Sequence, residues 1–506
     1  MLIGSAVAAS AVMAGCIFHY EDDCVRARDC PQGTGGASSS TGTMTSTGGT
    51  GGAPPLGCDP SKATKPVADS CGVFVSPNGD DMNKGTKEKP LKTITAALAK
   101  GTTIYACAGP MPFSEAVTLG KAVTLYGALD CASWVYDASK KTQLMAKADA
   151  VPLMIGSGGH TSEVNDFAIR AASAMQDGGS SIAVLVNGAT ASFTRCDLAA
   201  GDGKDGLAGA SGGAQAMAAD PGLGGDAASK PTQGGGTGGV NAVCTLAGGK
   251  GGDGGAIVNG DGSDGTQGDG SVGGAKGTGE TSSASCSNGA NGDKGIAGPF
   301  GPAASGLGSI NATGYHGGDG QPGMDGTNAK SGGGGGGSKA SNTVHGAGGG
   351  GGGAGGCGGK LGTGGKAGGS SIALVSVGAT VTMTSCTLKA GHGANGGVGG
   401  DGQFGQFGGA AGLGGPGSMS VADACNGGKG GKGGDGGNGG GGLGGHSLGI
   451  AAIGTAPVLD AATKSASTPG TNGKGGKGGN MDASMNHGAD GTAAGCWDFG
   501  SNAACK

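Results

Sequence analysis

Runs of glycine constrain this chain more than any other feature. Glycine accounts for 129 of the 506 residues, and between Gly201 and Gly500 it recurs in stretches such as GGKGGKGG, which begins at Gly427. Glycine loses more backbone freedom on ordering than any other residue and has no side chain to bury. This part of the chain is therefore poorly suited to form the rigid walls of an active site. It favours a spacer, a coat or an adhesive surface.

Composition excludes several classes of protein. Only 3% of the residues are aromatic and 13% are charged, which is typical neither of an ordinary globular protein nor of a charged disordered one. The net charge is −5, and of the 31 basic residues only Arg26, Arg28, Arg170 and Arg195 are arginine. Because nucleic-acid binding needs a clustered basic face, no nucleic-acid partner is expected.

The N-terminus has the pattern of an export signal. Residues Leu2 to Gly15 are apolar or small and uncharged, too short a run to span a bilayer but long enough for the core of a signal peptide. The run ends VMAG before Cys16 and resembles a bacterial lipobox, although Met13 stands where leucine is commonest. That resemblance implies lipidation of Cys16 and a membrane partner through the lipid anchor. Ile17, in place of a retention aspartate, implies an outer-membrane lipoprotein of a Gram-negative cell, at the cell surface or secreted; an ordinary leader with a chance cysteine is the alternative.

The cysteines favour disulfides over metal binding. There are 15 of them, without the CxxC pairs that announce structural zinc, so neither a metal nor a cofactor is expected. If Cys16 is lipidated, an even number remains, which fits disulfides in an oxidising compartment. Four of them lie within the glycine-rich part and are placed to staple it: Cys244, Cys286, Cys357 and Cys425.

A low-complexity linker precedes the first segment of normal composition. Residues Gly33 to Pro55 are nearly all Gly, Ser, Thr and Ala, which is typical of a flexible tether with a reach of about 25–30 Å. The alternative is a loop inside a domain, but loops of this length are uncommon. The tether would lift the folded part away from a membrane.

From Cys58 to Ala200 the sequence alternates short apolar runs with turns. Phe74 and Val75 predict a strand, Asn78-Gly79 a turn, and Pro90 a helix start. This order resembles the N-terminal entry motif of right-handed parallel β-helix proteins of the pectin-lyase-like class, in which the helix caps the open end of the solenoid. An unrelated small α/β domain is the alternative. Further short β-branched runs follow at 103–106, 113–119 and 123–127.

An internal repeat supports a solenoid. The run GSSIAVLVNGAT at Gly179 recurs as GSSIALVSVGAT at Gly369, and a weaker copy starts at His446. Repeats of this kind bury their apolar faces only by stacking on a neighbour. The predicted fold is therefore all-β, a right-handed parallel β-helix with a short N-terminal capping helix, in which Val184 and Leu374 lie in adjoining coils. The glycine-rich segments become insertions between coils. Cys196 and Cys386 occupy equivalent positions of the two copies, and a disulfide between them is our hypothesis.

The glycine-rich insertions have several candidate structures. Collagen needs an unbroken three-residue period and more proline than the 18 residues present, and a calcium-binding β-roll needs a regular nonapeptide that is missing. Gly-Gly-X triplets favour polyglycine-II-like helices with three residues per turn, which place every X on one edge. Plain disorder is the rival structure. The arrangement also resembles, in composition alone, the glycine-rich (PGRS-like) surface proteins of mycobacteria.

These features divide the chain into successive segments. We expect a signal peptide (1–15), a lipid-anchored cysteine segment and linker (16–57), an N-terminal β-helix part (58–200), a glycine-rich insertion (201–368), a β-helix coil (369–392), a second insertion (393–445), and a C-terminal coil with a glycine-rich tail (446–506).

The function expected is non-catalytic, a structural or adhesive role at the cell surface with glycans as partners. The β-helix class also contains polysaccharide lyases and hydrolases, so a carbohydrate-active enzyme is the alternative, and an ice- or mineral-facing bundle is a third. For the enzyme, the nearest candidate residues are Asp166, Arg170, Arg195 and Asp197. We interpret them instead as solvated residues at strand ends, and no HExxH or GxSxG motif in a suitable context accompanies them.

Overall fold

The computed structural model describes residues 57–269, 272–481 and 485–505. Its regular structure is almost entirely β, with two sheets of seven strands, one of six and two of two strands. No helix in these ranges is long and apolar enough to cross a membrane. The predicted signal peptide, the lipidation site Cys16 and all but the last residue of the segment 16–57 lie outside the described residues.

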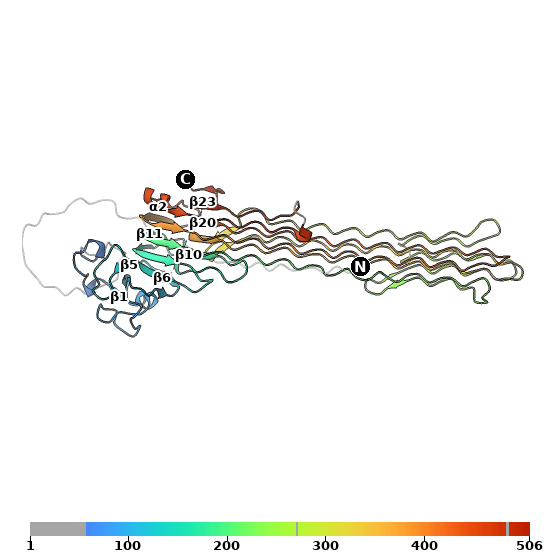
Figure 1. Cartoon of the computed structure of the whole chain (residues 1–506), viewed down its shortest axis with the longest axis horizontal. Helices are drawn as coiled ribbons and strands as arrows, with labels where there is room; N and C mark the ends of the chain where they lie inside the picture. Colours follow the sequence, from blue (N-terminus) through green and yellow to red (C-terminus); the bar gives the residue numbers. More distant parts are fainter. Residues whose placement is uncertain (1–56, 270–271, 482–484, 506) are drawn as a thin grey trace, which may run out of the picture. The chain divides into compact units, whose positions relative to one another are not determined.

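Three large sheets, named A, B and C here, make up the β part (Figure 1). Sheet A contains β1 (Val73–Val75), β2 (Thr103–Cys107), β5 (Thr124–Leu129), β8 (Thr161–Asn165), β11 (Thr190–Thr194), β18 (Thr380–Thr384) and β21 (Val458–Leu459). Sheet B contains β3 (Phe113–Ser114), β6 (Thr142–Met145), β9 (Phe167–Arg170), β12 (Asp197–Ala199), β19 (Thr387–Lys389) and β22 (Ser467–Thr468). Sheet C contains β4 (Val117–Leu119), β7 (Leu153–Ile155), β10 (Ser181–Asn187), β17 (Ser371–Val377), β20 (Ser447–Ile453), β23 (Ala493–Asp498) and β24 (Ala503–Ala504).

The strands follow a simple rotation. From β4 to β23 the chain visits sheets C, A and B in turn, and every pairing along this path is parallel. Two antiparallel hairpins lie outside the rotation: β13 (Val240–Asn241) with β14 (Leu246–Ala247), and β15 (Ser309–Asn311) with β16 (Gly314–His316). Helical structure in the described part of the chain is limited to α1 (Ile94–Leu98), α2 (Ala461–Ser465) and the 3-10 turns Pro60–Lys62, Asp69–Cys71 and Gly479–Met481.

The internal repeat lies side by side, as predicted. In β10 and β17, Val184 pairs with Leu374, and in β17 and β20, Leu374 pairs with Ile450. All three side chains are fully buried in one apolar core. The weaker third copy that begins at His446 is therefore confirmed as a strand of the same sheet. Stacking of equivalent residues buries the apolar face that a single copy would expose.

Helix α1 packs against this core through Ile94 and Ala97, but Pro90 does not start the helix. The hydroxyl of Thr93 accepts a hydrogen bond from the Ala96 N–H at 3.1 Å, which makes Thr93 the N-cap. The Glu115 carboxylate accepts the Ile94 N–H at 2.7 Å. The helix begins at Ile94 because these two side chains accept hydrogen bonds from amide groups of its first turn. Pro90 provides no such cap.

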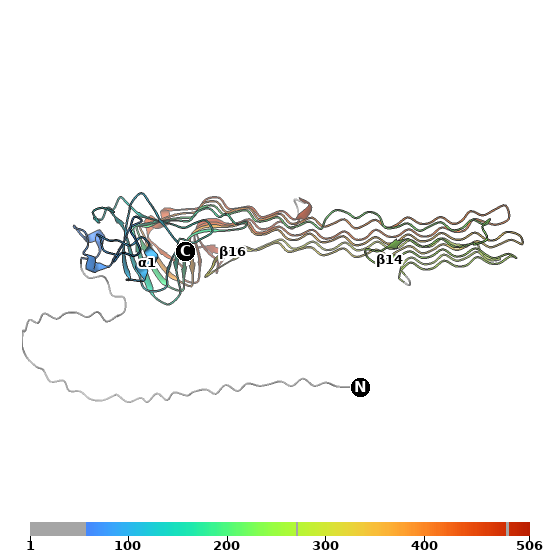
Figure 2. The same ribbon diagram turned by 90° about the horizontal axis from the view of Figure 1, so that it is seen from below.

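The glycine-rich segments occupy the three connections from sheet B to sheet C, between β12 and β17, β19 and β20, and β22 and β23. Figures 1 and 2 show them as extended chains running alongside one another. Their hydrogen bonds recur at every third residue: the amides of Gly427, Gly430 and Gly433 donate to the carbonyls of Gly412, Gly409 and Gln406 at 2.9–3.0 Å. Three residues per turn is the period of the polyglycine II helix that the triplets predicted.

The bundle continues the register of the sheets. The Gly365 amide donates to the Gly440 carbonyl, Gly368 to Leu443 and Ser371 to His446, a constant offset that leads directly into the pairing of β17 with β20. The four cysteines expected to staple the bundle do so, as Cys244–Cys357 and Cys286–Cys425. Three further disulfides are Cys58–Cys71, Cys107–Cys131 and Cys496–Cys505.

A buried histidine lies where the bundle enters sheet C. His446 is fully buried, and its Nδ1 accepts the Thr492 N–H at 2.8 Å while Nε2 lies 2.8 Å from the Leu307 carbonyl oxygen. Nδ1 must therefore be unprotonated, with the proton on Nε2 donated to the carbonyl. Burial lowers the pKa of His446 below its usual value of 6.5.

We expect this histidine to make folding sensitive to mild acid. Because the folded-state pKa is lowered, the unfolded chain binds more protons below pH 6.5, so stability is full above that pH and falls as the pH drops toward the folded-state value. The slope in that window should reach about 1.4 kcal/mol per pH unit. Denaturant unfolding between pH 4.5 and 8 on the intact protein and on His446→Gln would measure it, with the exposed His392→Gln as control. Equal slopes in all three proteins would contradict the assignment.

Candidate functional site

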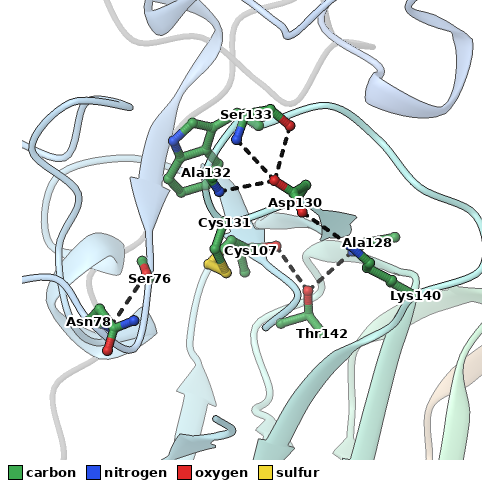
Figure 3. The surroundings of a disulfide bond; sticks show 12 residues. Ser76, Asn78, Cys107, Ala128, Asp130, Cys131, Ala132, Ser133, Lys140 and Thr142 are labelled. Carbon is green, nitrogen blue, oxygen red and sulfur yellow. Dashed lines mark hydrogen bonds and ion pairs between the residues drawn. A yellow bond between two sulfur atoms is a disulfide. The ribbon is translucent and has the colours of Figure 1, made fainter. Parts of the chain in front are cut away.

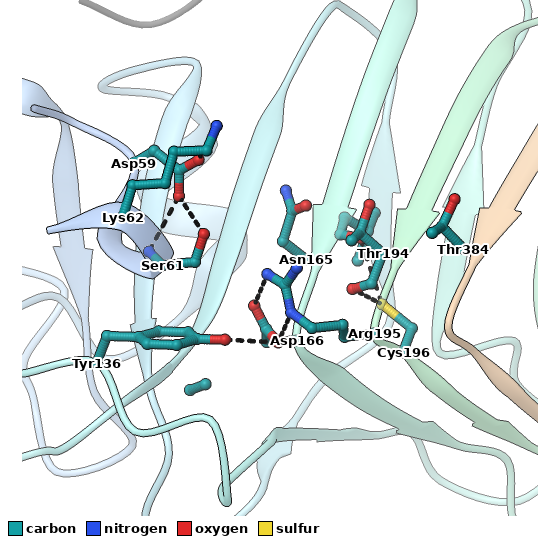
Figure 4. Close-up of polar contacts among 12 residues, drawn as sticks. Asp59, Ser61, Lys62, Tyr136, Asn165, Asp166, Thr194, Arg195, Cys196 and Thr384 are labelled. Atoms are coloured by element: carbon teal, nitrogen blue, oxygen red, sulfur yellow. Dashed lines mark hydrogen bonds and ion pairs between the residues drawn. The ribbon is translucent and has the colours of Figure 1, made fainter. Parts of the chain in front are cut away.

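Two of the four residues suggested for an enzyme, Asp166 and Arg195, form an ion pair. Asp166 and Arg195 occupy equivalent turns between sheets A and B, both at positive φ (61° and 52°), as is Ser385 (53°) in the next copy. The Arg195 guanidinium donates from Nε to Asp166 Oδ1 and from Nη2 to Oδ2, both at 2.7 Å, and the Tyr136 hydroxyl lies 3.2 Å from Oδ1 (Figure 4). The Asp166 side chain is 4% exposed. Hydrogen bonding to Asp166 raises the pKa of Arg195.

The other two suggested residues lie apart from this pair. Asp197 Oδ1 accepts from Lys141 Nζ and from the Thr387 hydroxyl, each at 2.6 Å, and Arg170 is exposed at the end of β9. Each aspartate is thus held by a cation that leaves little room for a role as base or nucleophile. Our interpretation of the four as solvated residues at strand ends fits Arg170 but is wrong for Asp166, which is buried in a turn because its carboxylate is paired with Arg195.

Cys196 and Cys386 lie in adjacent copies, as the repeat required, but the structure leaves both thiols free. The Cys386 Sγ accepts the Cys196 N–H at 3.3 Å, and each sulfur also lies near a carbonyl oxygen of the preceding rung, Val164 for Cys196 and Phe193 for Cys386. The hypothesised disulfide is absent because each thiol points along the stack to a backbone carbonyl. Burial raises the pKa of Cys196, which keeps its thiol protonated and unreactive.

A hollow of about 500 Å³ lies beside Cys131, whose disulfide with Cys107 is drawn in Figure 3. Asp130 accepts the backbone amides of Ala132 and Ser133 at 3.1 and 3.0 Å and the Lys140 ammonium at 3.0 Å. The Ser133 amide is the main cause of the lowered pKa of Asp130. Its carboxylate is therefore occupied in holding the turn that follows Cys131.

A groove on the glycine bundle has a different character. Its floor is the X row of segment 426–445, and its walls are the neighbouring segments 288–304 and 391–415. The Gly298 amide donates to the Asp435 carbonyl at 2.8 Å, and the Gly436 amide donates to the Gln403 carbonyl at 2.8 Å, so both walls are bonded to the floor. The hollow between them has a volume of about 290 Å³, and its lining comprises Ala297, Gly298, Phe300, Asp401, Gly402, Phe404, Asp435, Gly436, Asn438 and Asn480. We call it the phenylalanine groove.

Aromatic rings stand exposed along this groove. Phe300 is 51% exposed and Phe404 59%, and Phe407, one turn further along the same wall, is 55% exposed. The Lys432 ammonium lies 5.9 Å from the ring centre of Phe404 and 5.7 Å from that of Phe407. A second hollow of about 320 Å³, beside the Cys244–Cys357 disulfide, also has Phe404 in its lining. Clustered exposed aromatic groups are typical of interaction surfaces.

The polar floor of the groove is fixed in place. Asp435 Oδ1 accepts the Gly405 N–H at 2.8 Å and the Lys432 ammonium at 2.7 Å, and Asn438 Oδ1 accepts the Gly402 N–H at 2.7 Å. Burial acts to raise the pKa of Asp435, but the bonds from Lys432 and Gly405 outweigh it and the pKa is lowered. Asp435 is therefore ionised at neutral pH.

Sequence analysis did not find this groove. Phe404 and Phe407 end two successive Gly-Gln-Phe triplets and Lys432 ends a Gly-Gly-Lys triplet, and this three-residue spacing was the available signal. Phe300 is more than a hundred residues away in sequence from the other wall, and nothing in the sequence indicated which segments are neighbours.

Two further findings concern metal binding and similarity to known proteins. In the described ranges 57–269, 272–481 and 485–505, no group of three or more His, Cys, Asp and Glu side chains is placed to hold a metal ion. Comparison of the chain with protein-family models, with characterised proteins and with solved structures finds no match.

Proposed function

We propose that this chain is a non-catalytic surface protein with a structural and adhesive role, whose glycine bundle is a rigid support for side chains that contact glycans. The observation that carries the proposal is the lattice of backbone hydrogen bonds at every third residue, which orders the exposed phenylalanine groove. A flexible glycine-rich chain could not hold aromatic groups in a fixed array without a large loss of conformational entropy on binding.

The proposal includes an architecture and a location. The chain passes in rotation through three sheets, and its strands pair parallel from β4 to β23. This path supports a right-handed parallel β-helix of the pectin-lyase-like class, with the glycine-rich segments as insertions. Five disulfides among the described residues fit an oxidising compartment, in keeping with a lipoprotein anchored through Cys16 at the outer membrane or cell surface.

The rival function, a polysaccharide lyase or hydrolase, is less well supported. It would need groups free to act as acid or base, whereas Asp166 is paired with Arg195, and Asp197 with Lys141. These pairs stabilise turns and strand ends of the kind expected in a structural scaffold.

A two-part assay tests the proposal. Beads coated with the full chain are expected to adhere to glycan-coated surfaces and to release no oligosaccharide from uronate polymers. Arg170→Gln and Asp166→Asn should leave both results unchanged. Release of oligosaccharide that either substitution abolishes would establish the enzyme instead, and failure to adhere to any glycan surface would reject the adhesive role.

A further inference from the structure

We propose that the phenylalanine groove binds a neutral polysaccharide in extended conformation, with the polymer axis along the glycine bundle. This inference rests on the adhesive function proposed above and adds the class of ligand and its orientation. Three observations lead to it: the apolar walls, the charge of the lining and the spacing of the side chains.

The walls suit the apolar faces of sugar rings. Phe300 and Phe404 line the groove from opposite sides, and both rings are about half exposed. Phenylalanine has no hydrogen-bonding group, so these rings can contribute only apolar and dispersion contacts. A pyranose ring presents C–H groups on its faces and hydroxyl groups at its rim, and it therefore matches apolar walls above a polar floor.

The lining selects for neutral sugars. Asp401 Oδ1 accepts the Asn480 amide and Asp435 Oδ1 accepts from Lys432, but neither Oδ2 has a donor among the described residues. These two oxygens can accept hydrogen bonds from ligand hydroxyls. None of the described residues that line the groove is cationic, although the Lys432 ammonium lies beside it, 2.7 Å from Asp435 Oδ1. Asp435 is paired with Lys432, but Asp401 has no cationic partner among the described residues, so a uronate or sulfated polymer would place its anions next to an unpaired carboxylate, which is electrostatically unfavourable.

The spacing suits a polymer over a single sugar. In a helix of three residues per turn, successive X side chains are separated by about 9.3 Å. Phe404 and Phe407 stand one such repeat apart on the wall, as do Asp435 and Asn438 on the floor. This distance is comparable to the length of a disaccharide unit in an extended chain, so equivalent rings of one polymer can meet equivalent side chains. The three-residue turn of the bundle backbone sets the spacing of these side chains, and the backbone hydrogen bonds keep it fixed.

Binding measurements on the full chain test the inference. Calorimetric titration with a soluble neutral β-glucan is expected to show binding, and with polygalacturonate of matched length binding at least about tenfold weaker. Phe404→Ala should weaken binding of the β-glucan about tenfold, because a central aromatic contact is removed. The matched control is Leu413→Ala, an exposed residue (70%) on the same segment outside the groove, which should change nothing.

A second variant tests the effect of charge in the groove. Asp435→Asn retains the shape of the floor and removes one negative charge, so it should reduce the preference for the neutral polymer over polygalacturonate several-fold. Unchanged amide exchange in the bundle verifies that each variant is folded.

The outcomes separate this inference from the function on which it rests. Tighter binding of polygalacturonate, or equal loss of affinity in Phe404→Ala and Leu413→Ala, would overturn the ligand class and its site while beads still adhere to glycan surfaces. Failure of the unsubstituted protein to adhere to any glycan surface would overturn the proposed function itself.

Discussion

Removal of the Cys286–Cys425 disulfide by the double substitution C286S/C425S is expected to lower the free energy of unfolding by about 5 kcal/mol. The bond joins cysteines 139 residues apart. A cross-link between residues so distant in sequence removes a large amount of loop-closure entropy from the unfolded chain, and glycine-rich chains have the most such entropy to lose. Denaturant unfolding followed by circular dichroism would measure the change.

The chain provides a control of the same chemistry. Cys496–Cys505 spans only 9 residues, and its removal should cost about half as much, near 2.6 kcal/mol, because loop-closure entropy grows with loop length. Equal losses from the two double substitutions, or no loss from C286S/C425S, would contradict the view that disulfides order the bundle by shrinking its unfolded ensemble.

Gly350→Ala is expected to destabilise the bundle by about 3 kcal/mol. Gly350 is buried, its amide donates to the Cys425 carbonyl at 2.9 Å and its carbonyl accepts the Gly335 amide at 2.9 Å. A Cβ atom at this position would overlap the carbonyl oxygen of Gly412. Relief of the overlap must separate two backbones, which adds lost hydrogen bonds to the cost of overpacking.

The matched control is Gly224→Ala, also in the bundle. A Cβ atom there would meet only the Leu413 carbonyl oxygen, at 3.5 Å, an ordinary van der Waals contact. The change in unfolding free energy should be below about 1 kcal/mol, and of either sign, because alanine also reduces the entropy of the unfolded chain. If the two alanine variants are equally stable in denaturant titrations, the glycines do not pack as closely as the structure has them.

Much of the β part could be predicted from the sequence because it depends on local pattern and repetition. The runs at Gly179 and Gly369 are nearly identical, and identical strands in a parallel stack pair residue with residue, so the partnership of Val184 with Leu374 followed. The start of α1 was placed wrongly at Pro90, because the Glu115 carboxylate that caps it comes from a distant strand turn.

The arrangement of the bundle could not be predicted in the same way. A Gly-Gly-X triplet specifies its own helix and the edge on which X lies, but every bare glycine face is chemically alike, so the sequence does not select neighbours. Segment 426–445 pairs parallel with 288–304 and antiparallel with 391–415, and the phenylalanine groove exists only because of that choice. Likewise, the repeat placed Cys196 beside Cys386 but did not determine the direction of the thiols.

Amide hydrogen exchange along Gly427 to Gly445 tests the central claim most directly. The Gly433 and Gly434 amides donate to Gln406 and Thr327 at 2.9 and 3.0 Å, whereas the Lys432 amide has no acceptor among the described residues. The ordered bundle therefore predicts slow exchange at the glycines and faster exchange, with a period of three, at Lys432, Asp435 and Asn438, whose amides have no acceptor among the described residues. The Lys429 amide, which donates to Asn291 Oδ1 at 2.8 Å, should exchange slowly. Exchange of all these amides at the rate of an unstructured chain would show that the glycine-rich segments do not fold into a bundle.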